Sequence, residues 1–99
     1  MDDLVYHTVV KTPHGYRVGD VTVTVENEII KGTLHLPDLK GRFSGNLRSD
    51  GRFDLAAEIE VDSTLTSCSG EGRISFHCIH ISVLCDDFYY EIDGTSLRY

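Results

Sequence analysis

The sequence predicts an all-β protein, a single small antiparallel meander of seven or eight strands that forms a compact barrel or sandwich. Three observations favour this class. Apolar and polar residues alternate with a period of two along most of the chain, and no long stretch keeps apolar groups at helical spacing. Turn-forming glycine, proline, asparagine and aspartate recur at intervals of roughly 8–12 residues. The 99 residues suit one domain, which is expected to span 1–99.

The first part of the chain contains three expected strands. Residues 5–10 alternate, with apolar groups on both sides, and form the first. The segment TPHG, Thr12–Gly15, is typical of a turn, because proline fixes one φ angle and glycine permits a positive one. The clearest strand is Val21–Glu26, with the sequence VTVTVE. Asn27-Glu28 is expected to turn the chain into the third strand, Ile29–Leu36.

The segment Lys40–Asp62 is typical of a β-hairpin, and the tripeptide GRF occurs in both of its arms. Its turn is predicted at Ser49–Gly51, because aspartate and glycine tolerate the left-handed backbone angles of tight turns. Each arm has one apolar and one polar face. That pattern is typical of an antiparallel sheet that is covered on one side and exposed to water on the other.

The second half of the chain is less regular. A short strand at Thr64–Cys68 is expected inside an irregular connection. The run Arg73–Cys85 changes the parity of its apolar residues near its middle, which predicts either a β-bulge or a strand buried on both faces. Phe88–Asp93 is the next expected strand, ended by Gly94, and residues 95–99 are expected to add a short tail strand.

The apolar faces of these strands define the expected core. Two glycines on these faces, Gly32 and Gly45, are expected to leave space in the interior. The expected core residues are Val21, Val23, Val25, Leu34, Leu36, Phe43, Leu47, Phe53, Leu55, Ile59, Ile74, Phe76, Phe88, Tyr90 and Ile92.

Cys68, Cys78 and Cys85 are an odd number of cysteines, and a disulfide framework usually needs an even number. The favoured interpretation is three reduced thiols acting as small buried apolar groups. One disulfide with one free thiol is an alternative. A metal site formed by these cysteines and His80 is a third, but the short paired spacings of zinc sites are missing from the sequence. No metal ligand and no cofactor is therefore predicted.

The net charge of −7 is unevenly distributed along the chain. Residues 1–52 hold equal numbers of acidic and basic residues, whereas the only bases among residues 53–99 are Arg73 and Arg98. The electrostatic field of such a protein repels nucleic acid and anionic membranes and favours cationic partners. We therefore expect a basic protein surface as the partner, with no direct nucleic-acid binding and no membrane binding.

Acidic side chains of the second half form the predicted partner-binding site. Alternate residues on a strand share a face and lie about 6.5–7 Å apart, a distance comparable to the phosphate spacing of a nucleic-acid strand. The favoured hypothesis is a non-enzymatic protein–protein interaction module, in its sharpest form an inhibitor that docks an acidic sheet face onto a basic, nucleic-acid-binding surface. The predicted partner-binding residues are Asp54, Glu58, Glu60, Asp62, Tyr89, Glu91 and Asp93.

The alternative function is a small β-barrel carrier of a lipid or another apolar ligand, because a closed sheet can enclose a lumen. An enzyme is not favoured, and no catalytic residue is predicted, because the sequence has no nucleophile elbow, P-loop or dinucleotide-binding motif. The first ten residues, MDDLVYHTVV, lack the features of a signal peptide, which predicts a cytoplasmic protein. Exposed edge strands would make a homodimer possible.

Overall fold

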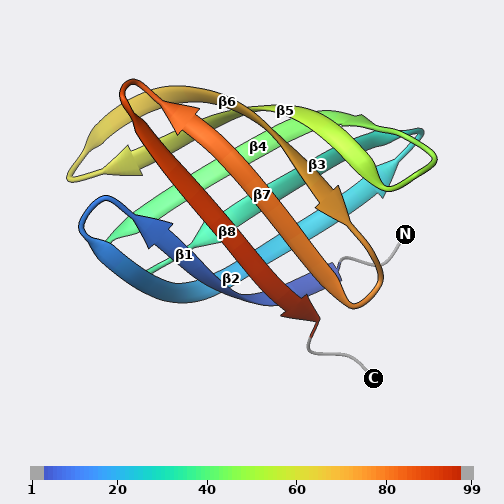
Figure 1. Cartoon of the computed structure of the whole chain (residues 1–99), viewed down its shortest axis with the longest axis horizontal. Helices are drawn as coiled ribbons and strands as arrows, with labels where there is room; N and C mark the ends of the chain where they lie inside the picture. Colours follow the sequence, from blue (N-terminus) through green and yellow to red (C-terminus); the bar gives the residue numbers. More distant parts are fainter. Residues whose placement is uncertain (1–3, 97–99) are drawn as a thin grey trace.

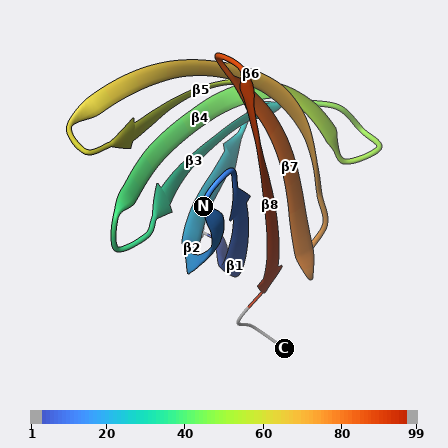
Figure 2. The same cartoon turned by 60° about the vertical axis from the view of Figure 1, so that its left-hand side comes forward.

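Eight antiparallel strands follow one another in chain order and close into a barrel (Figures 1 and 2). The structure is a computed structural model that describes residues 4–96. It confirms the all-β prediction and selects the barrel over the sandwich. Residues 4–96 contain no helix long and apolar enough to cross a membrane. The strands are β1 (Leu4–Thr12), β2 (Gly15–Glu26), β3 (Ile29–His35), β4 (Leu39–Leu47), β5 (Arg52–Val61), β6 (Thr64–Ile74), β7 (Cys78–Cys85) and β8 (Phe88–Ser96).

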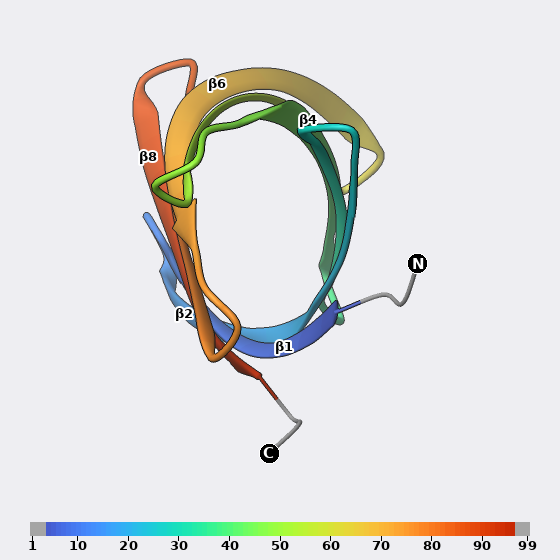
Figure 3. The same cartoon turned by 90° about the vertical axis from the view of Figure 1, so that its right-hand side faces the viewer.

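The barrel closes because β1 pairs with β8 as well as with β2. The closing ladder runs from Tyr6 opposite Ser96 to Lys11 opposite Glu91. Figure 3 looks into the barrel and shows the strands forming a ring. Since each described strand has a partner on both sides, the open edges on which the homodimer expectation rested are not present in the described barrel.

Two tight turns of this meander have left-handed backbone at both central residues. Asn27 and Glu28 have φ angles of 51° and 68° and join β2 to β3, which confirms the turn predicted there. Asp62 and Ser63 have φ angles of 51° and 67° and join β5 to β6 in the same way. Positive φ at both central residues matches the twist of a turn to the right-handed twist of the paired strands.

Side chains of alternate strand residues fill the barrel interior. The rings of Phe43 and Phe53 stack there with centroids 6.1 Å apart. A gap of about 10 Å³ lies beside Phe43, which is at the lower limit of the volume that holds one water molecule. The buried apolar residues are Tyr6, Val10, Val21, Val23, Ile30, Leu34, Leu36, Leu39, Phe43, Phe53, Leu55, Ala57, Ile59, Cys68, Ile79, Ile81, Val83, Cys85 and Ile92.

Gly32 and Gly45 do not leave the interior space that was expected of them. A Cβ atom on Gly32 would lie 2.3 Å from ring atoms of Phe43, so that ring already occupies the position. A Cβ atom on Gly45 would lie 1.9 Å from the carbonyl oxygen of Asp54. Both glycines therefore allow close packing and do not open a lumen for a ligand.

Strand β6 is a full strand and not the short segment expected at Thr64–Cys68. Gly70 and Gly72 lie inside the strand. A Cβ atom on Gly70 would meet the carbonyl oxygen of Ser82 on β7 at 1.9 Å. Glycine is needed here because the backbones of two strands approach closely, so its presence did not indicate a loop.

The parity change in the run Arg73–Cys85 has a cause that neither expectation included. β6 ends at Ile74, residues 75–77 form a turn, and β7 begins at Cys78, so the run belongs to two strands. Phe76 lies in this turn, and its side chain is exposed. The expectation that Phe76 belongs to the core is therefore wrong.

Two further expectations about β8 are corrected by the structure. Phe88, expected in the core, is half exposed because it lies at the first position of the strand, at the mouth of the barrel. The strand also continues through Gly94 to Ser96. Gly94 is buried among side chains of β1 and β7. Most of the expected tail strand lies outside the described residues.

A disulfide joins Cys68 on β6 to Cys85 on β7, whose Cα atoms lie 4.4 Å apart, and Cys78 is an exposed free thiol. This is the second of the three interpretations of the cysteines, so the favoured one, three reduced thiols, is wrong for Cys68 and Cys85. Disulfides persist mainly in oxidising compartments. The bond therefore does not favour the cytoplasmic location expected from the sequence.

Candidate partner-binding surface

The β5 part of the predicted acidic site is a row of three carboxylates. Asp54, Glu58 and Glu60 alternate with the buried residues of β5 and project from the outer face of the barrel. Asp62 was expected in this row, but it lies in the turn to β6, where its φ angle is 51°. Glu60 lies directly opposite Lys40 of β4. The row is thus shorter than predicted and has a cation beside it.

Two of these carboxylates form ion pairs with arginines of the neighbouring strand and its turn. Arg48 Nη1 lies 3.0 Å from Asp54 Oδ2, and Arg42 Nη2 lies 3.2 Å from Glu58 Oε1. Exposed pairs of this kind contribute only about 0–1 kcal/mol to stability. Their larger consequence is electrostatic, because each arginine cancels a negative charge that the acidic row would present to a partner.

The β8 part of the predicted site projects Tyr89, Glu91 and Asp93 from the outer face. Tyr89 is 67% exposed. The Asp93 carboxylate is paired with Nδ1 of His80 on β7, and Glu91 lies opposite Lys11 of β1. Tyr89 and Glu91 are therefore the members of this row whose side chains make no hydrogen bond or ion pair within residues 4–96.

The structure does not bring the β5 and β8 rows onto one surface. Strands β6 and β7 lie between them on one side of the barrel, and β1 to β4 on the other. In Figure 1, β8 crosses the front of the barrel whereas β5 runs behind it. One partner face that uses all seven predicted residues is therefore not available.

An aromatic surface lies beside the β8 row, where the β1–β2 and β7–β8 turns meet the same end of the barrel (left in Figure 1). We call this surface the aromatic end and define it by Pro13, Asp87, Phe88, Tyr89 and Glu91. These residues, with Lys11 and Thr12, line a hollow of about 450 Å³. The aromatic end combines exposed rings with carboxylates, and only one lysine lines the same hollow.

The position of Phe88 follows from the register of the barrel. Phe88 has the parity of the interior residues Tyr90 and Ile92, but it pairs with Cys85 at the last rung of the β7–β8 ladder. No further rung covers it on that side. The ring is therefore held at the barrel mouth, 51% exposed, beside the outward-pointing ring of Tyr89. Sequence periodicity detects the parity of Phe88, but it does not detect where the ladder ends.

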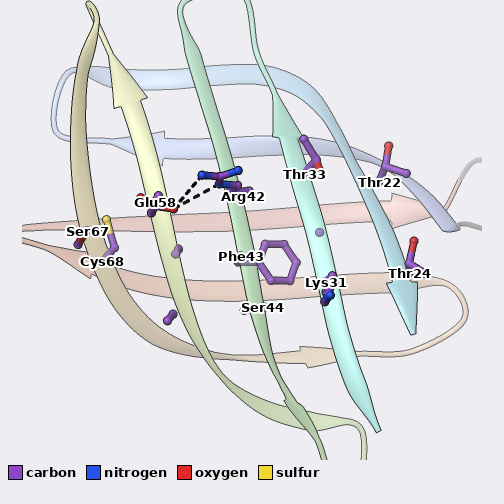
Figure 4. A pocket seen from close by; sticks show the side chains of 13 residues that line it. Thr22, Thr24, Lys31, Thr33, Arg42, Phe43, Ser44, Glu58, Ser67 and Cys68 are labelled. Atoms are coloured by element: carbon purple, nitrogen blue, oxygen red, sulfur yellow. Dashed lines mark hydrogen bonds and ion pairs between the residues drawn. The ribbon is translucent and has the colours of Figure 1, made fainter. Parts of the chain in front are cut away.

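A larger hollow of about 730 Å³ lies on the outer face of β2 to β6 (Figure 4). Thr22, Thr33, Arg42, Glu58 and Ser67 form one row across these five strands, each opposite the next. The row offers hydroxyl groups, but its two charged residues already bond to each other (dashed lines in Figure 4). We assign no ligand to this hollow.

The four residues of the alternative metal site, the three cysteines and His80, do not point to a common position. Cys68 and Cys85 face the interior and bond to each other, whereas Cys78 and His80 are exposed. Among the described residues, no group of three or more His, Cys, Asp or Glu side chains could hold a metal ion.

Tyr6 is a buried polar residue whose contact the sequence analysis missed. Its hydroxyl donates a hydrogen bond to the carbonyl oxygen of Ser75, 2.7 Å away, in the β6–β7 turn. Burial raises the pKa of the Tyr6 phenol above its ordinary value of 10.0, and the nearby Cys78 adds a smaller effect in the same direction. Tyr6 ties a surface turn to the core and shows no feature of a reactive group.

No protein-family model matches the chain, and comparison with curated proteins finds no match.

Proposed function

We propose that this protein is a non-enzymatic binding module that docks its aromatic end onto a basic surface of a partner protein. The observation that carries the proposal is the pair of adjacent rings, Phe88 and Tyr89, exposed by 51% and 67%. Exposed aromatic side chains beside a hollow are typical of the residues that dominate the energy of protein interfaces.

The charges around the rings favour a basic partner. Asp86 and Asp87 occupy the β7–β8 turn, and Glu91 flanks Tyr89 on the outer face. The whole chain carries a net charge of −7. A field of this sign accelerates encounter with a cationic surface and suppresses encounter with an anionic one. Nucleic-acid-binding proteins present such cationic surfaces, so inhibition of one of them is the sharper form of the proposal.

The filled interior supports a function on the outer surface. The interior gap of about 10 Å³ has no room for a lipid chain, and Phe43 occupies the space beside Gly32. Carriage of an apolar ligand, the alternative expected from the sequence, gains no support from this packing. The β5 row supports docking less than the aromatic end does, because arginines pair with Asp54 and Glu58.

The test is a comparison of partner capture by variants of the immobilised protein. Phe88→Ala and Tyr89→Ala are expected to lose a partner that the wild type captures from an extract of the cells that make it. Phe76→Ala is the matched control, since Phe76 is a turn aromatic with 55% exposure at the other end of the barrel. Each of these two alanine substitutions is expected to lower the affinity for the partner by at least tenfold, which is a loss of about 1.4 kcal/mol or more of binding free energy.

Salt and charge supply the second readout. Raising the salt concentration from 0.05 to 0.5 M is expected to weaken capture, and Glu91→Gln is expected to weaken it at low salt. Glu58→Gln is the matched control, because the Glu58 charge is already paired with Arg42. Capture that survives Tyr89→Ala and Phe88→Ala, or that fails equally with Phe76→Ala, contradicts the proposal.

A further inference from the structure

Three arginines and a histidine lie side by side across strands β4 to β7, at the end of the barrel opposite the aromatic end. Arg48, directly after β4, donates its backbone N–H to the carbonyl oxygen of Arg52, 2.8 Å away. Arg52 lies opposite Arg73, and Arg73 lies opposite His80. We call these four residues the arginine row. The barrel thus brings Arg48 and Arg52, from the first half of the chain, next to Arg73, from the acidic second half.

Such a row is unfavourable by itself, because like charges directly opposite each other on neighbouring strands destabilise a sheet. Local carboxylates compensate it only in part. Arg48 is paired with Asp54 at 3.0 Å, Arg52 Nε lies 3.9 Å from Asp50 Oδ2, and Nδ1 of His80 is paired with the Asp93 carboxylate. Arg73 makes no ion pair or hydrogen bond through its side chain within residues 4–96. Arg73 is thus the member of the row whose side chain has no carboxylate partner within residues 4–96, and an external anion would explain this feature.

The arginine row also borders a hollow of about 410 Å³, which is lined by the four residues of the row with Glu71, Gly72 and Ser82. Gly72 contributes only backbone to the hollow, because its side-chain position faces the barrel interior, where a Cβ atom would lie 2.4 Å from the Phe53 ring. Ser82 contributes a hydroxyl group. The β4–β5 turn is fixed against β6, since Ile74 donates its N–H to the carbonyl oxygen of Gly51, 2.8 Å away (Figure 3). The backbone positions of the arginines are therefore set by hydrogen bonds before any ligand arrives.

We propose that the arginine row binds a diphosphate or longer polyphosphate group of a small molecule. Neighbouring strands lie about 4.8 Å apart, so the Cα atoms of three arginines in a row span about 10 Å. That span is longer than one phosphate group and suits two or more linked phosphates. The guanidinium group is the side chain best suited to this contact, because its planar set of N–H donors matches phosphate oxygens in pairs.

Glu71 gives the proposal a distinctive consequence. Its carboxylate lines the hollow and lies opposite Asp54 on β5, so it repels an incoming anion. Removing this charge is expected to tighten binding.

The test is titration of the full chain with pyrophosphate in a phosphate-free buffer at constant ionic strength, followed by calorimetry. Saturable binding is expected. Arg73→Gln is expected to weaken it by about 10- to 100-fold, because charge-assisted hydrogen bonds to the anion are lost. Glu71→Gln is expected to strengthen it severalfold. Lys31→Gln is the matched control, since Lys31 is an exposed cation on the outer face of β3, and no change is expected.

Several outcomes overturn the proposal. These are the absence of saturable binding, sulfate binding as tightly as pyrophosphate, and equal losses with Arg73→Gln and Lys31→Gln. A melting curve for each variant separates loss of the fold from loss of binding, and these exposed polar substitutions are expected to leave the melting temperature nearly unchanged. Phe88→Ala is expected to leave pyrophosphate affinity unchanged, so this proposal and the proposed function can fail independently.

Discussion

Reduction of the Cys68–Cys85 disulfide is expected to destabilise the barrel without changing its fold. The two cysteines are 17 positions apart in the sequence. Closing a loop of that size removes about 10.5 cal/mol/K of chain entropy from the unfolded state, and this stabilises the folded state by about 3 kcal/mol at 25 °C. For a domain of this length, a change of 1 kcal/mol shifts the melting temperature by about 4–8 °C. Reduction should therefore lower the melting temperature by about 12–24 °C.

The assay compares oxidised and reduced protein by circular dichroism melting. A Cys78→Ser background is used for both samples, because the exposed Cys78 thiol could otherwise exchange with the disulfide. Mass spectrometry of alkylated protein counts the free thiols in each sample. Cys68 and Cys85 are both buried, so a reductant is expected to reach the disulfide only after partial unfolding. A reduced sample that melts within about 3 °C of the oxidised one would refute the entropic reasoning.

Three further predictions concern the barrel itself. Thr8 is fully buried, and its hydroxyl has no hydrogen-bond partner among the described residues 4–96. Thr8→Val is therefore expected to raise the free energy of unfolding in urea by about 1 kcal/mol. Gly45→Ala would place a Cβ atom 1.9 Å from the Asp54 carbonyl oxygen, and we expect a loss of about 1–3 kcal/mol or more in the same assay. Because burial raises the pKa of Tyr6 above 10.0 in the folded state, its contribution to stability is complete below pH 10 and is lost as the pH rises through the folded-state pKa. The stability of Tyr6→Phe should therefore fall less than that of the wild type as the pH rises above 10. At neutral pH the variant should be about 1 kcal/mol less stable than the wild type, because it lacks the hydrogen bond to Ser75.

The strands with strict alternation were predictable because burial on one face imposes a period of two. Val21 and Val23 of β2, and Phe53 and Leu55 of β5, are buried as expected. Prediction failed where a residue has a role that its type does not reveal. The segment after Cys68 was expected to be irregular, whereas Gly70 lies inside β6 and allows two strands to approach closely.

The candidate site was predictable only in part. Periodicity correctly placed Tyr89 and Glu91 on an outer face, because it assigns a residue to one side of its own strand. It gives no information about which strands become neighbours around a closed barrel. The separation of the two acidic rows and the pairing of Arg48 with Asp54 depend on those neighbours. The arginine row was missed for the same reason, since counting charges along the chain places Arg52 and Arg73 in different halves.

The most direct test of the central claim is photo-crosslinking from single positions on the barrel surface. A photoreactive phenylalanine analogue replaces Tyr89 at the aromatic end, Phe76 at the other end, or Glu60 in the β5 row. Of the three analogues, only the one at position 89 is expected to give a covalent adduct with a basic protein, and 0.5 M salt is expected to suppress that adduct. Adducts that form from position 60 or 76 but not from position 89 would contradict it.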